Sequence, residues 1–219
     1  MNRVLITGVS RGIGKSIAEK FLQEGWSVIG TSTSGTSPID HRALTVHVLN
    51  MLDPKSIKKF ADTIIGSKNA INVLINNAGI SVKNDGNQFV VIDSLRKILE
   101  VNLIGLIDLT ERLLPAILKG GHVINMSSGL ASLTERSGTY APAYSISKVA
   151  LNMYTRILAS RLEGKGVIVS SIDPGWVRTD MGGSAAPRDP SEPADEAFAL
   201  ATSNVDSGNF WHRGRKRSW

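Results

Sequence analysis

The stretch TGVSRGIGKS, residues 7–16, begins at the end of the apolar run RVLIT, residues 3–7. It finishes with GKS at 14–16. A loop that binds a nucleoside triphosphate also ends in glycine, lysine and serine or threonine, and it has another glycine five residues before that final glycine. That position holds Val9, and Gly8 lies one residue too far away. A loop one residue longer would not wrap a phosphate with the same N–H groups, so the sequence argues against a triphosphate site.

The same stretch has the spacing of another phosphate-binding turn, T-G-x-x-x-G-x-G, between a predicted strand and a predicted helix. Gly8 permits a sharp turn, Gly12 lets a cofactor approach the backbone, and Gly14 lets the helix pack against the strand. The helix N-terminus then offers N–H groups and a positive dipole end to a pyrophosphate. A tight strand-to-helix turn without a function has a similar composition, so the turn indicates a dinucleotide site only together with further motifs.

Short apolar runs rich in valine and isoleucine alternate with longer helical patterns along the chain. Such runs are typical of strands buried on both faces of a parallel sheet. The alternation predicts a single-domain, doubly wound α/β fold of the Rossmann type over residues 1–219, with helices on both faces of the sheet. The predicted strands are 3–7, 27–32, 44–49, 71–76, 122–127 and 167–173.

Four helices are expected between these strands, because apolar residues recur there at helical spacing. The first ends near Gly25, a residue suited to a helix C-terminus. The second begins at Asp53-Pro54, with aspartate as N-cap and proline in the first helical position. The third is expected from about Asp93 to Leu118, and the fourth from about Tyr144 to Leu162.

The composition excludes several classes of protein. The 219 residues include no cysteine and four scattered histidines, so no disulfide, cysteine nucleophile or metal site is predicted. No apolar run reaches the roughly 20 residues of a membrane span, and the strand at residue 3 leaves no room for a leader, so a cytoplasmic protein without a membrane partner is expected. The net charge is +6, and the basic tail at 212–219 is expected to be solvated rather than to bind nucleic acid.

Further motifs follow the glycine turn in order: NNAG at 76–79, VN at 101–102, SS at 127–128, YSISK at 144–148 and PGWVRTDM at 174–181. In this combination the chain resembles the short-chain dehydrogenase/reductase family from residue 3 to at least 181. The final residues SGNFWHRGRKRSW also resemble the end of carbonyl-reductase-like members. The resemblance implies a dinucleotide cofactor bound by Gly8, Ser10, Arg11, Gly12, Ile13, Gly14, Ser32, Thr33, Asn50, Met51, Asn77, Ala78, Gly79, Tyr144, Lys148, Pro174, Gly175, Val177 and Thr179.

The end of the second strand bears on the choice between NAD and NADP. It reads TSTS at 31–34, with no carboxylate before Asp40. Folds that prefer NAD place an acid there for the ribose 2′-hydroxyl, whereas hydroxyls can donate to a 2′-phosphate. Arg11 offers that phosphate a charge and a planar fork of donors. Arg11 could also be a solvated loop residue, but the missing acid favours the phosphate role, and NADP(H) is the expected cofactor.

Tyr144 and Lys148 lie four residues apart in a predicted helix, so they share one face. A phenol has an ordinary pKa of about 10, and a nearby ammonium lowers it, so the pair suits general acid and base catalysis. The resemblance implies that Tyr144 protonates a carbonyl oxygen and that Lys148 adjusts Tyr144 and bonds the nicotinamide ribose. It also implies that Ser128 holds the carbonyl and that Asn102 supports Lys148 through a water. Ser127 remains an alternative to Ser128, because only one of two adjacent strand residues faces the nicotinamide.

These motifs predict an NADPH-dependent reductase of aldehydes, ketones or quinones. A 3-oxoacyl-thioester reductase is the second enzyme hypothesis, and a dinucleotide sensor without turnover is the alternative from another class. The full set of catalytic residue types argues against a sensor, which needs only the cofactor half. The loop at 181–193 is rich in small residues and predicts an open pocket for a small-molecule carbonyl substrate. Relatives often form homodimers or homotetramers, and the sequence does not fix the number of subunits.

Overall fold

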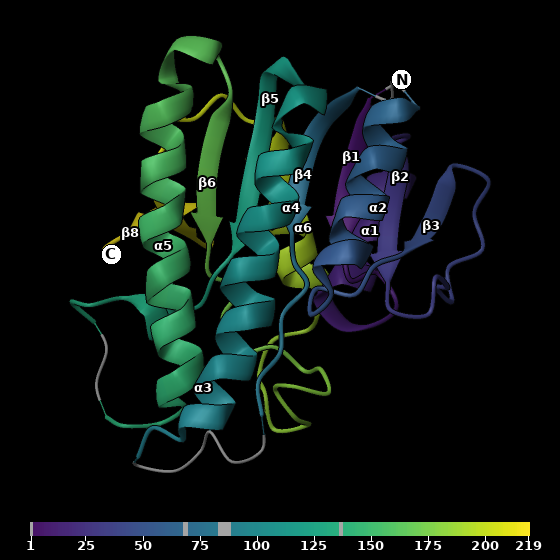
Figure 1. The fold of residues 1–219 in the computed structure, drawn as a ribbon. Helices are drawn as coiled ribbons and strands as arrows, with labels where there is room; N and C mark the ends of the chain where they lie inside the picture. The colour runs from purple at the N-terminus through teal and green to yellow at the C-terminus, as the bar shows by residue number, and fades with distance from the viewer. Residues whose placement is uncertain (1, 68–69, 83–88, 136–137) are drawn as a thin grey trace.

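The computed structural model describes residues 2–67, 70–82, 89–135 and 138–219, and an eight-stranded sheet runs through it (Figure 1). The strand order is β3-β2-β1-β4-β5-β6-β7-β8, parallel as far as β7, with β8 antiparallel to β7. This architecture confirms the predicted fold class. The strands are β1 Arg3–Thr7, β2 Ser27–Ser32, β3 Leu44–Val48, β4 Ile71–Asn76, β5 Ile117–Met126, β6 Ile168–Ile172, β7 Asn209–His212 and β8 Arg215–Arg217.

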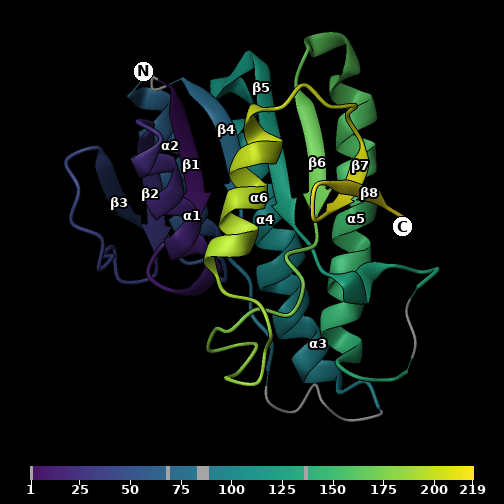
Figure 2. The ribbon, with the colours of Figure 1, turned by 180° about the vertical axis from the view of Figure 1, so that it is seen from behind.

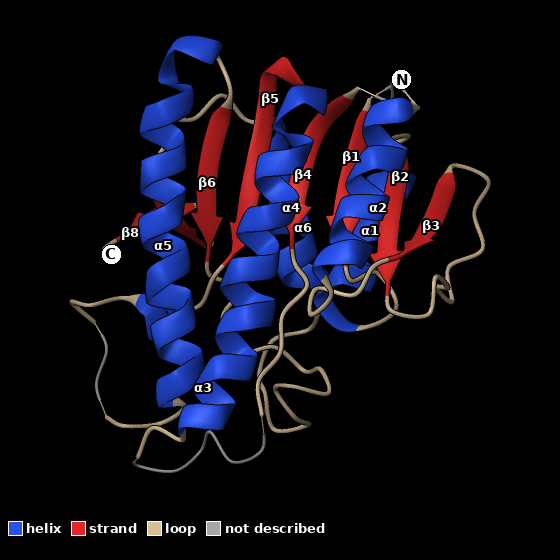
Figure 3. Cartoon of the chain, in the orientation of Figure 1, coloured by secondary structure: helices blue, strands red, loops and turns tan. Residues whose placement is uncertain are grey.

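Helices cover both faces of the sheet. α2 (Pro54–Gly66), α4 (Gly105–Leu113) and α5 (Pro142–Leu162) lie on one face, and α1 (Gly12–Gln23) and α6 (Ser191–Thr202) lie on the other (Figures 1 and 2). The connections that follow the strands gather at one edge, where the strand arrows end (Figure 3). In the described ranges, no helix has both the length and the apolar character needed to cross a membrane.

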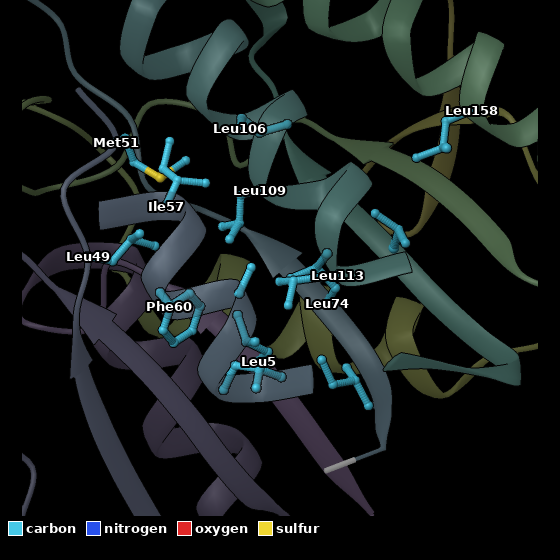
Figure 4. Close-up of a cluster of buried hydrophobic side chains, with 14 of the residues drawn as sticks. Leu5, Leu49, Met51, Ile57, Phe60, Leu74, Leu106, Leu109, Leu113 and Leu158 are labelled. Atoms are coloured by element: carbon cyan, nitrogen blue, oxygen red, sulfur yellow. The ribbon is translucent and has the colours of Figure 1, made fainter. Parts of the chain in front are cut away.

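Each face of the sheet has its own apolar core, because strands buried on both sides send alternate side chains in opposite directions. Leu5 of β1 and Leu74 of β4 pack beneath α2 and α4 (Figure 4). Their neighbours Ile6 and Ile75 are buried with Phe21 on the face covered by α1 and α6. The sheet is thus fixed from both sides, and its edge forms a rigid base for the loops.

The ends of the first two helices agree with the sequence. Gly25 follows α1 with a φ of 75°, a left-handed conformation that favours glycine, and its N–H donates to the Leu22 carbonyl. α2 begins at Pro54, and the carboxylate of Asp53 accepts a hydrogen bond from the Lys55 N–H at 2.9 Å. Local capping chemistry decides both boundaries.

The long third helix predicted over 93–118 is confirmed only in part, because its far end is wrong. α3 (Ile92–Leu99) passes into a π-helical turn, η2 (Glu100–Ile104), and then into α4, which ends in the 3₁₀ turn η3 (Leu114–Ala116). β5 then begins at Ile117, five residues before the predicted start of that strand. Pro115 ends the helix, because proline has no N–H and clashes with the preceding turn. The apolar residues Ile117 and Leu118 continued the helical spacing and so concealed the beginning of the strand.

The region after β6 is more regular than predicted. α6 begins at Ser191, so the last three residues of the predicted 181–193 loop are helical. The basic tail is not solvated throughout, because its residues 215–217 form β8. The Arg217 side chain is 19% exposed and pairs with Asp173 and Glu135. These partners lie 44 and 82 residues away along the chain, beyond the reach of a local pattern.

Candidate active site

A cleft of about 400 Å³ opens at the carboxyl ends of the parallel strands. β1 lies between β2 and β4, where the strand order reverses direction, and open α/β sheets bind ligands at such a point. The structure brings most of the sequence-predicted cofactor residues together there. Those that line the cleft are Gly8, Ser10, Arg11, Gly12, Ile13, Gly14, Ser32, Thr33, Asn50, Met51, Asn77, Ala78, Gly79, Tyr144, Lys148, Pro174 and Thr179.

Two predicted cofactor residues, Gly175 and Val177, are not part of this lining in the described structure. Gly175 has a φ of 74°, and a Cβ there would lie 2.9 Å from the Arg188 side chain. Val177 is buried and forms an isolated β-bridge with Arg188. Both residues shape the segment that covers the cleft. Their backbone is fixed by Arg188, which the sequence reasoning did not single out.

The cleft is also lined by ten residues that the sequence did not lead us to propose as cofactor ligands. Most of them are neighbours of proposed residues at strand ends, so a wider window around each motif would have found them. Lys97 lies in α3 outside every motif, and no sequence signal pointed to it. The ten are Thr31, Leu49, Leu52, Ile80, Lys97, Val101, Met126, Ser127, Asp180 and Met181.

The glycine turn is locked to the end of β4. A Cβ at Gly14 would lie 2.1 Å from the Gly8 carbonyl oxygen and 2.3 Å from the side-chain nitrogen of Asn77. That nitrogen donates to the Thr7 carbonyl at 2.8 Å and to the Gly8 carbonyl at 3.2 Å. Asn77 therefore uses its amide to hold the turn in place, and only a glycine fits at position 14.

The N-terminus of α1 points into the cleft and carries features that favour an anion. Its N-cap is Arg11, no side chain makes a capping hydrogen bond there, and the first turn contains no acidic residue. The first N–H groups of a helix lack partners within the helix, so a bound phosphate can accept from them. Thr179 lies over the turn, since a Cβ at Gly12 would be 3.2 Å from its methyl group. These residues fit the pyrophosphate of a dinucleotide.

Three side chains near the end of β2 bear on the recognition of a 2′-phosphate. The Ser32 hydroxyl is engaged in a turn, because it donates to the Thr36 carbonyl at 2.8 Å and accepts from the Thr36 N–H at 2.9 Å. Thr33 is exposed at the cleft. Arg11 pairs with Asp180 across the cleft, with 3.2 Å between Nε and Oδ2 and both side chains nearly four-fifths exposed. Arg11 and Thr33 are thus the accessible donors.

Lys148 lies one turn after Tyr144 on α5, as the spacing predicts. Its side chain is buried, and Nζ donates to the Met126 carbonyl at 2.7 Å. Burial lowers the pKa of the Lys148 ammonium to about 8. Nζ lies 5.5 Å from the centre of the Tyr144 ring. The ammonium is therefore close to the phenol, and its charged form is disfavoured by desolvation.

The expectation that the pKa of Tyr144 lies below its ordinary value is wrong. Burial raises the pKa of this phenol well above the usual range, the negative charge of Asp173 raises it further, and a hydrogen bond with the Ser128 hydroxyl opposes both. Desolvation disfavours the phenolate, and the Lys148 ammonium is not among the groups that shift this pKa. Tyr144 therefore keeps its proton at neutral pH.

The predicted catalytic residues Ser128 and Asn102 are not among the described residues that line the cleft, and Ser128 is half-buried whereas Asn102 is fully buried. The Ser128 hydroxyl contacts the Tyr144 side chain and also accepts from the Leu130 N–H at 3.2 Å. The neighbouring Ser127 is buried, and within the described structure its hydroxyl has no hydrogen-bond partner. Asn102 lies in η2, and its amide makes two hydrogen bonds to the backbone of Ile80, at 2.8 and 2.9 Å. π-helical turns are frequent at functional sites.

Gly79 shows how close Asn102 and Lys148 lie to each other. A Cβ at Gly79 would be 3.3 Å from Asn102 Oδ1 and 3.6 Å from Lys148 Nζ. The turn after β4 thus brings a glycine against both polar side chains. A bulkier residue would separate them.

The family model described as short chain dehydrogenase matches residues 2–189. The chain belongs to this family. It is therefore a short-chain oxidoreductase. Serine 3-dehydrogenase of Rhizobium radiobacter is 32% identical over 187 residues, which cover 81% of this chain and 73% of that protein. A 3-oxoacyl-acyl-carrier-protein reductase of Vibrio harveyi is 30% identical over 94% of this chain and 82% of its own length.

Three solved structures share the fold over the whole of this short-chain oxidoreductase. Carbonyl reductase Sniffer of D. melanogaster has a TM-score of 0.89 with 27% identity and full coverage of both chains. An NADPH-bound carbonyl reductase from chicken fatty liver has a TM-score of 0.90 with 27% identity, covering 100% of this chain and 94% of that one. An NADP-bound short-chain dehydrogenase/reductase from Burkholderia multivorans gives 0.91 and 26%, covering 100% and 99%.

Proposed function

We propose that this oxidoreductase uses NADPH to reduce the carbonyl group of an aldehyde, ketone or quinone, with Tyr144 as the proton donor. One observation carries the proposal: Tyr144 and Lys148 line the same cleft as the glycine turn. The contact between the Ser128 hydroxyl and Tyr144 places a second polar group beside the phenol. A cofactor held by the turn would therefore share the cleft with an acid.

The chain's own residues supply the parts of a dinucleotide site. The turn around Gly12 and the N-terminus of α1 would hold the pyrophosphate, and Arg11 with Thr33 would hold a 2′-phosphate. When bound, NADPH supplies the hydride. The carbonyl reductase from chicken fatty liver and the protein from Burkholderia multivorans, which carry NADPH and NADP respectively, support this choice of cofactor.

The polar side chains then divide the work of proton transfer. Tyr144 retains its proton at neutral pH, because burial and Asp173 disfavour the phenolate, and so it can donate to a carbonyl oxygen. Ser128 holds the substrate oxygen beside the phenol. The ammonium of Lys148 stabilises the phenolate that forms, and Asn102, whose Oδ1 lies near the same side of Gly79 as Lys148 Nζ, supports Lys148. The charge that develops on the phenol thus meets groups that are already in place.

A 3-oxoacyl-thioester reductase is the second candidate, and the similarity to the Vibrio harveyi enzyme over most of both chains favours it. The two candidates share the cofactor and the proton donor and differ in the substrate. Rates of NADPH oxidation with simple ketones, quinones and a 3-oxoacyl thioester, with NADH in parallel, distinguish them. A strong preference for the thioester would replace the leading proposal by this second one.

The first prediction tests the proton donor itself. Tyr144→Phe removes the hydroxyl and keeps the ring, so kcat for carbonyl reduction is expected to fall about a thousandfold, within the usual range for a lost general acid. Binding of NADPH, measured by fluorescence titration, is expected to stay close to that of the parent protein. The matched control is Tyr140→Phe, because Tyr140 is a mostly exposed phenol outside the lining of the cleft. A dinucleotide sensor would keep its function in both variants.

A further inference from the structure

A buried carboxylate lies where the chain enters the cleft after β6. Asp173 directly precedes Pro174, and its side chain is 3% exposed. One oxygen, Oδ1, accepts from the Gly175 N–H at 2.9 Å. The other, Oδ2, pairs with the guanidinium of Arg217 from β8 and lies 3.1 Å from Nδ1 of His212 in β7. The C-terminal strand pair thus supplies the side-chain partners of this carboxylate.

The same guanidinium reaches the segment that follows the predicted catalytic serine. Arg217 Nη2 lies 2.5 Å from the Glu135 carboxylate. A Cβ at Gly129, the residue after Ser128, would be 2.8 Å from Arg217 Nη1 and 3.1 Å from Asp173 Oδ2. The ion pair therefore packs directly against the backbone beside Ser128.

The last residue of the chain reinforces this attachment. The Trp219 carbonyl accepts from the Thr134 N–H at 3.3 Å, and the Trp219 ring stacks on Phe210 with 5.5 Å between ring centres. The end of the chain is thus bound to the segment 129–135 by backbone as well as by charge. β8 and this segment form one unit at the substrate side of the sheet.

Asp173 also acts on the phenol of Tyr144, whose pKa it raises. The other cations of this region have different partners: Lys148 donates to the Met126 carbonyl, and Arg188 bonds the Pro174 carbonyl and pairs with α6 carboxylates. Within the described structure, Arg217 is therefore the one arginine or lysine side chain that pairs with Asp173. The His212 ring lies beside this pair. A buried carboxylate without such a partner would repel a forming phenolate strongly.

We propose that Arg217 is a positioning residue for proton transfer: its guanidinium neutralises Asp173 beside Tyr144 and holds the segment that carries Ser128. The inference rests on the proposed role of Tyr144. A purely structural role would confine Arg217 to stabilising β8. The two roles differ in the pH dependence of the reaction, because only the first couples the charge of residue 217 to the phenol.

The experiment follows alcohol oxidation with saturating NADP as a function of pH. In this direction the phenolate accepts the proton, so the rate rises as Tyr144 loses its proton. The positive charge of the nicotinamide in bound NADP would favour the phenolate and bring this rise to lower pH than the raised pKa of the free protein indicates. Arg217→Met removes the guanidinium from Asp173 and leaves, of its described side-chain and N–H partners, only the His212 ring and the Gly175 N–H beside the carboxylate. The rising limb is therefore expected to move to higher pH by about one unit or more. Asp173→Asn removes the negative charge and leaves Arg217, so the limb is expected to move to lower pH. Lys216→Met, on the same strand with its partner Asp206 far from the cleft, should not move it.

Shifts of the rising limb in opposite directions in the two single variants support the inference. The double variant, Arg217→Met with Asp173→Asn, supports it if its rising limb returns toward that of the parent protein. Unchanged limbs, or shifts of both single variants in the same direction, overturn it. If Arg217→Met does not fold, Arg217→Gln, which keeps a polar side chain without the charge, takes its place with the same expected shift to higher pH. Tyr144→Phe separates the two proposals: a parent limb that survives this change contradicts the role of Tyr144. A rising limb that is lost in Tyr144→Phe but does not move in Arg217→Met or Asp173→Asn contradicts only the role of Arg217.

Discussion

The two ends of the cleft are held in different ways. At the cofactor end, the turn after β1 is fixed by short-range contacts to its backbone, since the Gly8 carbonyl and the side-chain amide of Asn77 that bonds to it leave no space for a Cβ at Gly14. At the catalytic end, the segment after Ser128 is fixed by charged side chains of residues far apart in the sequence, Asp173 and Arg217. Backbone contacts cannot adjust, whereas long side chains can. Similar substitutions should therefore have different consequences at the two ends.

The largest effect is expected for Gly14→Ala. The new methyl group would lie 2.1 Å from the Gly8 carbonyl oxygen, so α1 has to move away from β1. The free energy of unfolding is expected to fall by about 3 kcal/mol, at the upper end for overpacked sites, and NADPH binding to be lost. Urea denaturation and fluorescence titration measure the two effects. Gly66→Ala is the control, because no heavy atom lies within 4 Å of a Cβ there, and its stability should change by less than about 1 kcal/mol.

A smaller effect on stability is expected for Gly129→Ala, which tests the other end. Its Cβ would lie 2.8 Å from Arg217 Nη1, the far end of a flexible side chain that can withdraw. The free energy of unfolding should fall by about 1 kcal/mol or less. The kcat of carbonyl reduction should fall about tenfold, because Arg217 no longer sits between Asp173 and the segment beside Ser128.

Gly164→Ala is the control for this variant, since no heavy atom lies within 4 Å of a Cβ there and Gly164 is not among the residues that line the cleft. It should alter neither kcat nor the free energy of unfolding appreciably. If Gly129→Ala were as destabilising as Gly14→Ala, the contrast between a backbone-held end and a side-chain-held end would be lost. The same conclusion would follow if Gly129→Ala left kcat unchanged.

The same contrast explains which parts could be predicted from the sequence. The glycine turn and the capping of α2 by Asp53 depend on residues close together in the chain, so their spacing carries the information. The pairing of Tyr144 with Lys148 on one helix is also local. These features define the fold class and the cofactor end of the cleft.

The remainder depends on contacts between distant segments. The role of Arg217 was invisible because its partners Glu135 and Asp173 lie 82 and 44 residues away, so a basic tail looked like a solvated one. The π-helical turn η2 between α3 and α4 could not be predicted, because the apolar spacing continues through it. The pKa of Tyr144 could not be predicted from its helical neighbour Lys148 either, because burial and the charge of Asp173 raise that pKa.

The smallest effect on stability is expected at Arg11, a side-chain contact at the backbone-held end. Arg11→Ala should reduce the preference for NADPH over NADH, measured as a ratio of kcat/KM values, about tenfold, or about 1.4 kcal/mol. The effect is modest because the guanidinium is 79% exposed and already pairs with Asp180, so solvent and salt screen its charge. Stability should not change, since no buried group loses a partner. Lys15→Ala, which removes an exposed pair with Glu19 on the same helix, should leave the ratio unaltered. An unchanged ratio in Arg11→Ala would make Arg11 a solvated loop residue and leave the choice of cofactor to Thr33.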